Sequence, residues 1–257
     1  MAKQDLTDDT GIDDPATHDI GDDNGVDDPA THDVGDDNGV DGPSDWLAGT
    51  NGIDRLVGSA GADQLAGHGG DDLLDGGAGI DLARYAGQRA ESTLHKTATG
   101  WSVASALDGT DMLVNVERLK FSGISVALDL SGNAGTVAKI LGAVFGREAV
   151  SNEGYVGIGL YYLDSGMSYE TLVQLAIDVR LGAGASHRAI VDLLYTNVVG
   201  SSPLDADRDH FVGLLDRGEF TVAGLGVMAA DLDINQNNID LVGLSQQGLE
   251  FVPYAGA

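Results

Sequence analysis

Four copies of a nine-residue unit follow one another in residues 49–84: GTNGIDRLV (49–57), GSAGADQLA (58–66), GHGGDDLLD (67–75) and GGAGIDLAR (76–84). Glycine fills the first and fourth places of every copy, and aspartate fills the sixth. The eighth place is apolar and holds Leu56, Leu65, Leu74 and the smaller Ala83. Such agreement does not arise by chance, and a short fixed period predicts equivalent turns of chain that stack on one another.

These residues resemble the RTX (repeats-in-toxin) nonapeptide G-G-x-G-x-D-x-U-x, a calcium-binding repeat of parallel β-rolls. In that family two nonapeptides make one turn, and ions lie between loops two repeats apart. The resemblance therefore implies that Asp54 pairs with Asp72 and Asp63 with Asp81, with about two or more Ca²⁺ ions in all. The metal-site residues that it implies are the aspartates and the first-place and third-place residues, namely Asp54, Asp63, Asp72, Asp81, Gly49, Asn51, Gly58, Ala60, Gly67, Gly69, Gly76 and Ala78.

The chemistry of the repeat agrees with this reading. Glycine permits tight left-handed turns, and a glycine-rich loop exposes carbonyl oxygens. Calcium prefers hard oxygen ligands, and the short aspartate side chain can turn back onto an ion held by those carbonyls. Two features depart from the family pattern, because the second place is glycine only at Gly77 and Ala83 is a small core residue. A metal-free solenoid is the alternative, but its stacked carboxylates would repel one another.

Composition points to cations as partners. Acidic residues outnumber basic residues by 41 to 13, and the net charge of −28 disfavours a nucleic-acid backbone or an anionic lipid surface. Residues 1–84 hold 21 aspartates and no glutamate, which favours turns and metal loops over helices. The absence of cysteine excludes disulfides, thiolate metal sites and cysteine nucleophiles. No apolar run reaches the roughly 18 residues of a membrane span.

Residues 1–45 read as an acidic arm. A 14-residue repeat occupies 8–21 and 22–35, and a third copy begins at Asp36 and stops near Ser44. No aromatic residue precedes Trp46, so the arm cannot bury enough apolar surface to offset its ordering entropy. We expect a disordered, solvated arm, and a calcium-ordered arm is the alternative.

Residues 87–131 are expected to form a β segment that caps the open end of the roll. Strands are predicted over residues 101–107, 112–114 and 124–128. Residues 109–121 are similar to a segment that often follows RTX repeats in secreted bacterial proteins. A cap of this kind would bury Trp101 and Phe121. A ligand platform at Trp101 is the alternative.

From Gly132 onward the apolar spacing becomes helical and predicts an all-α bundle of about six helices. The expected N-caps are Ser168, Ser186, and Asp205 or Asp207. The last of the expected helices spans 237–247. Residues 190–200 and 211–218 look similar to a helical domain of uncharacterised function that recurs beside RTX repeats in secreted bacterial surface proteins. That resemblance carries no catalytic residues with it.

No motif for catalysis or nucleotide binding appears, such as G-x-S-x-G, H-E-x-x-H or a Walker A loop. Asp205, Asp207 and Asp209 have EF-hand spacing, but His210 stands where the loop needs glycine. We therefore expect a helix start there rather than a calcium loop. His95, His187 and His210 have no local partner pattern, and a triad assembled in space stays open.

The sequence as a whole predicts an α+β protein in several parts. They are an arm (1–45), a short calcium-binding parallel β-roll (46–86), a β cap (87–131), and an all-α bundle with a C-terminal secretion signal (132–257).

The predicted function is that of a secreted, non-enzymatic protein that self-associates with calcium into an extracellular filament or sheet. The RTX resemblance implies export by the type I secretion machinery of a Gram-negative bacterium, in accord with the acidic start at Met1–Asp5, which is unlike a cleaved signal. An adhesin or binding module acting through the helices is the first alternative. An extracellular hydrolase is the second.

Overall fold

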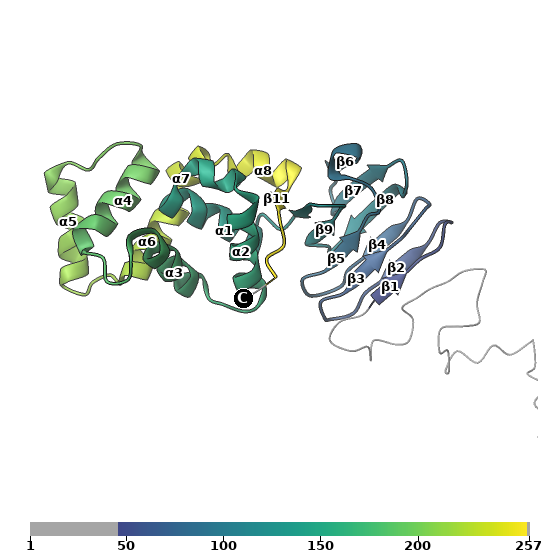
Figure 1. The fold of residues 1–257 in the computed structure, drawn as a ribbon, viewed down its shortest axis with the longest axis horizontal. Coiled ribbons are helices and arrows are strands. Elements are labelled where there is room, and N and C mark those ends of the chain that lie inside the picture. Colours follow the sequence, from purple (N-terminus) through teal and green to yellow (C-terminus); the bar gives the residue numbers. More distant parts are fainter. Residues whose placement is uncertain (1–45, 256–257) are drawn as a thin grey trace, which may run out of the picture.

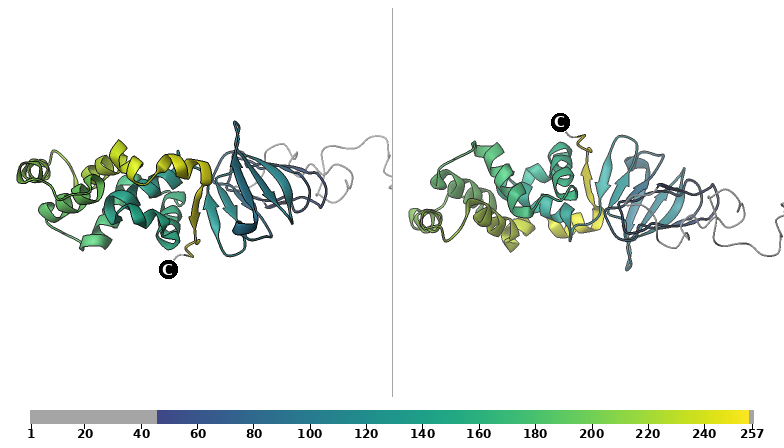
Figure 2. Two further views of the ribbon diagram at one scale, coloured as in Figure 1. Left: turned by 90° about the horizontal axis from the view of Figure 1, so that it is seen from above. Right: turned by 90° about the horizontal axis from the view of Figure 1, so that it is seen from below.

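The computed structural model describes residues 46–255, which form a β lobe and a helical lobe joined end to end (Figure 1). Two further views show both lobes along one axis, with the first strands of the β lobe farthest from the helices (Figure 2). Residues 1–45, for which we expected a disordered or calcium-ordered arm, lie outside the described residues, as do residues 256–257.

The strands of the four nonapeptides and the strand just before them stack as a parallel β-roll. They are β1 (Trp46–Ala48), β2 (Arg55–Val57), β3 (Gln64–Ala66), β4 (Leu73–Asp75) and β5 (Leu82–Arg84). Each pairs in parallel with the strand two repeats along, so that β1, β3 and β5 share one sheet while β2 and β4 share the other. Leu56 lies opposite Leu74, and Leu65 lies opposite Ala83. These four side chains are fully buried between the sheets, as the eighth-place pattern predicted.

The parallel layers continue beyond residue 86. The following strands are β6 (Thr93–Lys96), β7 (Trp101–Ser105), β8 (Gly109–Val114), β9 (Arg118–Lys120) and β10 (Ser125–Ala127). Strands β8 and β9 pair in parallel with β4 and β5, whereas β6, β7 and β10 add antiparallel strands. The three predicted strands correspond to β7, the second half of β8, and β10. Trp101 and Phe121 are buried, as expected of a cap.

The helical lobe contains eight α-helices among the described residues. They are α1 (Asn133–Ile140), α2 (Glu153–Asp164), α3 (Tyr169–Leu181), α4 (His187–Val199), α5 (Asp205–Asp216), α6 (Val222–Asp231), α7 (Asp233–Asn238) and α8 (Leu241–Gln247). A π-helical turn, Leu141–Phe145, extends α1. The expected helix at 237–247 is divided, because Asp240 adopts a left-handed conformation (φ 50°) and caps α8 by accepting from the Gly243 N–H.

The N-cap predictions are confirmed at two positions and wrong at one. The Ser168 and Ser186 side chains accept hydrogen bonds from the N–H groups of Thr171 and Ala189. Helix α5 instead begins at Asp205 itself, and Leu204 occupies its N-cap position without a side-chain bond. Asp205 and Asp207 lie in the first turn, where their carboxylates face the positive end of the helix dipole.

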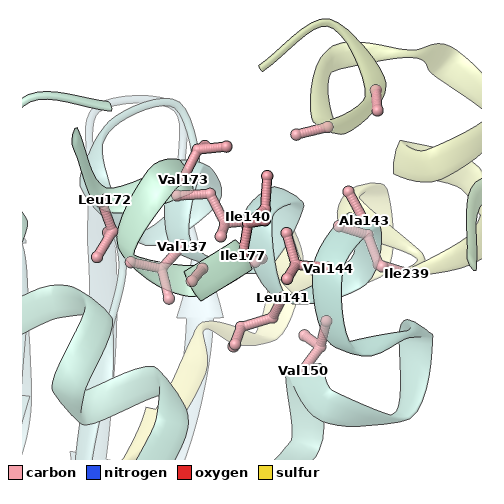
Figure 3. Packing of buried hydrophobic residues seen from close by; sticks show 14 of the residues in the cluster. Val137, Ile140, Leu141, Ala143, Val144, Val150, Leu172, Val173, Ile177 and Ile239 are labelled. Carbon is pink, nitrogen blue, oxygen red and sulfur yellow. The ribbon is translucent and has the colours of Figure 1, made fainter. Parts of the chain in front are cut away.

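One continuous apolar core unites the helices. Val137 and Ile140 of α1 and Val144 of the π-helical turn lie near Val173 and Ile177 of α3 (Figure 3). These side chains are almost completely buried, and their spacing is the helical period predicted from Gly132 onward.

The expectation of purely helical structure after Gly132 is wrong at the end of the chain. Strand β11 (Leu249–Phe251) returns to the β lobe and pairs antiparallel with β10, completing a six-stranded sheet. Alternating burial explains the strand, since Leu249 and Phe251 are buried while Glu250 is exposed.

A buried arginine also joins the lobes. Arg118 of β9 donates to Asp129, in the segment before α1, and to Asp164 at the end of α2. In the part of the chain that the structure describes, no helix is long and apolar enough to span a membrane.

Candidate metal centre

The sixth-place aspartates form two rows, one on each side of the roll. The first and third repeats (the odd repeats) run from the sheet that contains β1 to the sheet that contains β2, and the second and fourth repeats (the even repeats) run back. In the odd row, the Asp54 N–H donates to Asp72 Oδ1 at 2.9 Å. In the even row, the Asp63 N–H donates to Asp81 Oδ1 at 2.8 Å. The structure thus brings together the two pairs that the sequence indicated, Asp54 with Asp72 and Asp63 with Asp81.

Both rows contain one further carboxylate that the sequence analysis missed. The Asp72 N–H donates to Asp111 Oδ1 at 3.0 Å, and the Asp81 N–H donates to Glu117 Oε2 at 2.9 Å. The sequence held a signal for Asp111. Gly109, Asp111 and Leu113 follow one another at intervals of two residues, as do the fourth-place glycine, sixth-place aspartate and eighth-place apolar residue of each repeat. Glu117 had no such signal, because it is a glutamate rather than an aspartate and the loop before it is shorter than the loops of the four repeats.

The first two loops close onto their own carboxylates. Asp54 Oδ2 accepts hydrogen bonds from the Thr50 N–H at 2.6 Å and from its hydroxyl at 3.0 Å. Asp63 Oδ2 accepts from the Ser59 N–H at 2.7 Å. In these loops the second residue therefore already satisfies one oxygen of the aspartate.

The third and fourth loops leave that oxygen without a partner. Their second residues, His68 and Gly77, have φ angles of 63° and 87°. Asp72 Oδ2 and Asp81 Oδ2 are buried and accept no hydrogen bond. A buried carboxylate oxygen without a donor is costly, and a bound cation would remove that cost.

The electrostatic environment supports the same reading. Burial raises the pKa of Asp81 to about 7, and the charges of Glu117 and Asp63 add to the effect. Burial likewise raises the pKa of Asp111 to about 7, and the charge of Asp72 adds to the effect. Burial raises the pKa of Asp72 as well. Several buried carboxylates are therefore crowded together in the two rows.

Backbone oxygens complete the donor set. The first-place carbonyls of Gly67 and Gly76 point at the loop above, where a Cβ on Gly49 or Gly58 would meet them at 2.8 Å and 2.4 Å. Only glycine fits at Gly49 and Gly58, so the layers approach closely enough to share an ion.

The third-place residues stack in the same way. The Gly69 N–H donates to the Thr50 carbonyl, and Gly69 lies against Asn51. The Ala78 N–H donates to the Ser59 carbonyl, beside Ala60. Within residues 46–255, no group of three or more His, Asp or Glu side chains converges on one point. An ion in the roll must therefore draw most ligands from the backbone, which suits calcium.

The other acidic and histidine candidates do not assemble. Asp207 accepts from the Tyr195 hydroxyl, and Asp205 pairs with Arg208, which also binds Asp192. These contacts belong to a helix surface, as expected for this segment. His187 Nδ1 lies 2.6 Å from Asp216 Oδ1 on the exposed ends of α4 and α5.

A match to a known repeat family supports the reading of the roll. The family model of the RTX calcium-binding nonapeptide repeat (4 copies) matches residues 48–83. The extracellular lipase LipA from Serratia marcescens is a similar solved structure, with 19% identity over 35% of this chain and 16% of that chain, and a TM-score of 0.19. The similarity therefore spans less than a fifth of the lipase. No curated protein matches the chain. The chain carries RTX repeats, which bind Ca²⁺ and are typical of type I-secreted extracellular proteins of Gram-negative bacteria.

Proposed function

We propose that this is a secreted, non-enzymatic structural protein whose β-roll is ordered by calcium and which then self-associates through the free end of the roll. The observation that carries the proposal is a sheet edge that no other strand among residues 46–255 pairs with. Strands β1 and β2 end the two sheets at the side farthest from the helices. Their outer N–H and C=O groups offer a template for strands of a second copy.

The opposite ends of the sheets are covered, which makes the free end distinctive. Strand β11 ends one sheet and packs against α2, and α8 packs beside β6 at the end of the other, where Lys96 Nζ donates to the Ser245 carbonyl. At the free end, Trp46 is 56% exposed and Ile53 is 83% exposed. Exposed aromatic and aliphatic side chains beside an open strand edge favour association.

The geometry also bears on the form of the assembly. A contact between two free roll ends is isologous, so it closes at a dimer. A filament or sheet needs a second surface on the same molecule. Large apolar side chains exposed on α2 and α3 supply a candidate for it, namely Tyr155, Ile158, Tyr161 and Val179.

Calcium would determine when this assembly takes place. The cytosolic ion concentration is too low for weak external sites, whereas sites of about millimolar affinity fill outside the cell. The protein would thus stay dispersed until export and order afterwards. This timing suits the type I secretion route that is typical of RTX proteins.

Light scattering after size-exclusion chromatography tests the assembly step. We expect dimers or larger species at millimolar calcium and monomers in chelator. Trp46→Lys places a charge at the free edge and should abolish association, while Val242→Lys, at a still more exposed site on α8, should not. A variant lacking residues 2–45 separates the contribution of the arm. A monomer at every calcium concentration overturns the structural role.

Export is tested by transfer of the C-terminal region. Truncation after Asp231 would also remove β11 from its sheet, so loss of secretion alone would be ambiguous. Fusion of residues 232–257 to a neutral passenger avoids this problem. We expect secretion of the fusion only when a type I exporter is present, and retention in its presence contradicts the proposed route.

An adhesin is the second candidate, and a groove in the helical lobe favours it. The groove lies between α1, α2 and α3 and is lined by apolar residues, including Leu141, Phe145, Tyr155, Ile158 and Val179. A monomeric protein that binds cells or glycans, and loses binding in Ile158→Lys, would support this function over assembly.

A further inference from the structure

The roll contains a fifth nonapeptide that is split in the sequence, and its first half is Tyr85 and Ala86. In intact repeats, the first residue donates its N–H to the last residue of a strand in the next layer, as Gly58 does to the Asp75 carbonyl at 2.7 Å. Tyr85 directly follows the fourth repeat and donates to the Lys120 carbonyl at 2.9 Å. Tyr85 therefore occupies a first-place position.

Residues 108–114 are the second half. In intact repeats, the residue after the sixth-place aspartate donates to the aspartate above it, as Leu73 does to the Asp54 carbonyl at 3.0 Å. Met112 donates to the Asp72 carbonyl at 2.8 Å in the same way. Asp111 is therefore a sixth-place residue.

The two halves meet where the chain leaves the roll after Ala86 and returns to it at Asp108. The Ala86 N–H lies 3.4 Å from Asp108 Oδ1, and Asp108 Oδ2 accepts from the Ser105 hydroxyl at 2.8 Å. Residues 87–107, which contain β6 and β7, are thus an insertion between the second and third places of the repeat. Without it, the fifth unit would read YADGTDMLV.

The third layer also holds a buried carboxylate oxygen that lacks a partner. Asp111 is 1% exposed, and Asp72, directly above it, is 2% exposed with Oδ2 unpaired. The buried Tyr85 hydroxyl lies beside the Asp111 carboxylate. Two buried carboxylates and a phenol oxygen therefore lie in one layer.

We propose that a third-layer calcium site lies between loop 67–72 and the split loop, with the Asp72 and Asp111 carboxylates as ligands. The relation of Asp72 to Asp111 repeats that of Asp54 to Asp72, including the bond from N–H to Oδ1. The Gly70 carbonyl supplies a further oxygen, since it points at Gly109 so closely that a Cβ there would meet it at 1.8 Å.

The site occurs on one side of the roll only. On the even side, only Asn115 and Val116 separate β8 from Glu117, so this loop lacks the residues that supply third-place to fifth-place carbonyls. We therefore assign no matching ion to Glu117. The site is independent of the assembly proposed above, because it concerns ion binding by a single chain.

Isothermal titration of the full chain with calcium tests the site. Asp111→Asn keeps an oxygen that can accept from the Asp72 N–H, so the layer should still fold. We expect the variant to bind one ion fewer than the unaltered protein. Asp209→Asn removes the same charge from the exposed surface of α5 and should leave the ion count unchanged. An unchanged count in Asp111→Asn overturns the proposal.

A second measurement does not depend on the folding of any variant. Crystals of the unaltered protein grown with calcium would show the ions by anomalous scattering. We expect a peak in contact with both Asp72 and Asp111. Peaks at the four intact repeats but none at Asp111 would overturn this proposal while leaving calcium binding by the RTX repeats in place.

Discussion

Thr50 and His68 occupy the same place of two stacked repeats, yet they give their loops different properties. Thr50 has an ordinary backbone conformation and satisfies Asp54, whereas His68 has a positive φ angle and leaves Asp72 with a free oxygen. The sequence predicted the aspartate rows, because each sixth place carries its own cue. It did not predict which aspartates keep a carboxylate oxygen without a hydrogen-bond partner, since that depends on a hydrogen bond within each loop.

Substitution at the second place should therefore have opposite effects in the two loops. His68→Gly relieves a left-handed conformation that suits glycine, and we expect a gain of about 1 kcal/mol in the free energy of unfolding. Thr50→Gly removes a hydroxyl bond to Asp54 and adds chain entropy, with an expected loss of about 1 kcal/mol. Urea denaturation of both variants in calcium measures the changes, and equal signs would contradict this account of the loops.

The raised pKa values of Asp81 and Asp111 predict an unusual pH dependence without calcium. Each carboxyl has a pKa of about 7 in the fold and an ordinary, lower value in the unfolded chain. The folded state therefore binds more protons between those values, and its stability falls as pH rises from about 4 to above 7. In chelator, circular dichroism should therefore show a larger folded fraction of the roll at pH 5.5 than at pH 8.

Calcium should reverse this order, because the ion binds the charged carboxylates and displaces their protons. If each ion displaces one proton, the affinity for calcium should fall about tenfold for each pH unit below 7. Greater stability at pH 8 than at pH 5.5 in chelator would show that the carboxylates are compensated by something other than an ion.

Strands and helices were predictable where each segment carries its own period. The roll strands follow from eighth-place apolar residues, and α3 and α4 follow from a serine cap with a helical apolar face. The fifth repeat was hidden because an insertion breaks the period and Tyr85 replaces glycine. Strand β11 was missed because a three-residue segment gives little pattern, and its partner β10 is far away in sequence.

The thin core of the roll makes its leucines individually important. Leu74 is fully buried between the sheets and pairs with Leu56 and Leu113 in adjacent layers. We expect Leu74→Ala to lower the free energy of unfolding by about 2–5 kcal/mol, because it leaves a cavity in a layer that cannot collapse without shifting the strands. Ile53→Ala, at a highly exposed loop position, should change it by about 0.5 kcal/mol or less. Similar effects of both changes would contradict the described packing.

One link between the two lobes runs through β9, since Glu117 directly precedes this strand and Arg118 is its first residue. Glu117 accepts from the Asp81 N–H in the metal-binding roll, while Arg118 pairs with Asp129 and Asp164 of the helical side. Ordering of the roll therefore also fixes the surface on which the helices dock.

Removal of the Arg118 charge should consequently destabilise the whole molecule. Arg118→Gln leaves Asp129 and Asp164 partly buried without a counter-charge, and we expect a loss of about 3–5 kcal/mol. Arg147→Gln removes an arginine that pairs with Glu148 on the exposed surface, and should cost less than about 1 kcal/mol. Calorimetry compares the two variants, and a small effect of Arg118→Gln would mean that the lobes do not depend on this contact.

Hydrogen exchange of the full chain, with and without calcium, tests most directly whether the ion orders the roll. The N–H groups of Asp54, Asp63, Asp72 and Asp81 bond to row carboxylates, so their exchange reports on the rows themselves. We predict strong protection of residues 46–121 on addition of millimolar calcium, while peptides from α3 and α4 change little and serve as the internal reference. Equal exchange of residues 46–121 in chelator and in calcium would contradict the account.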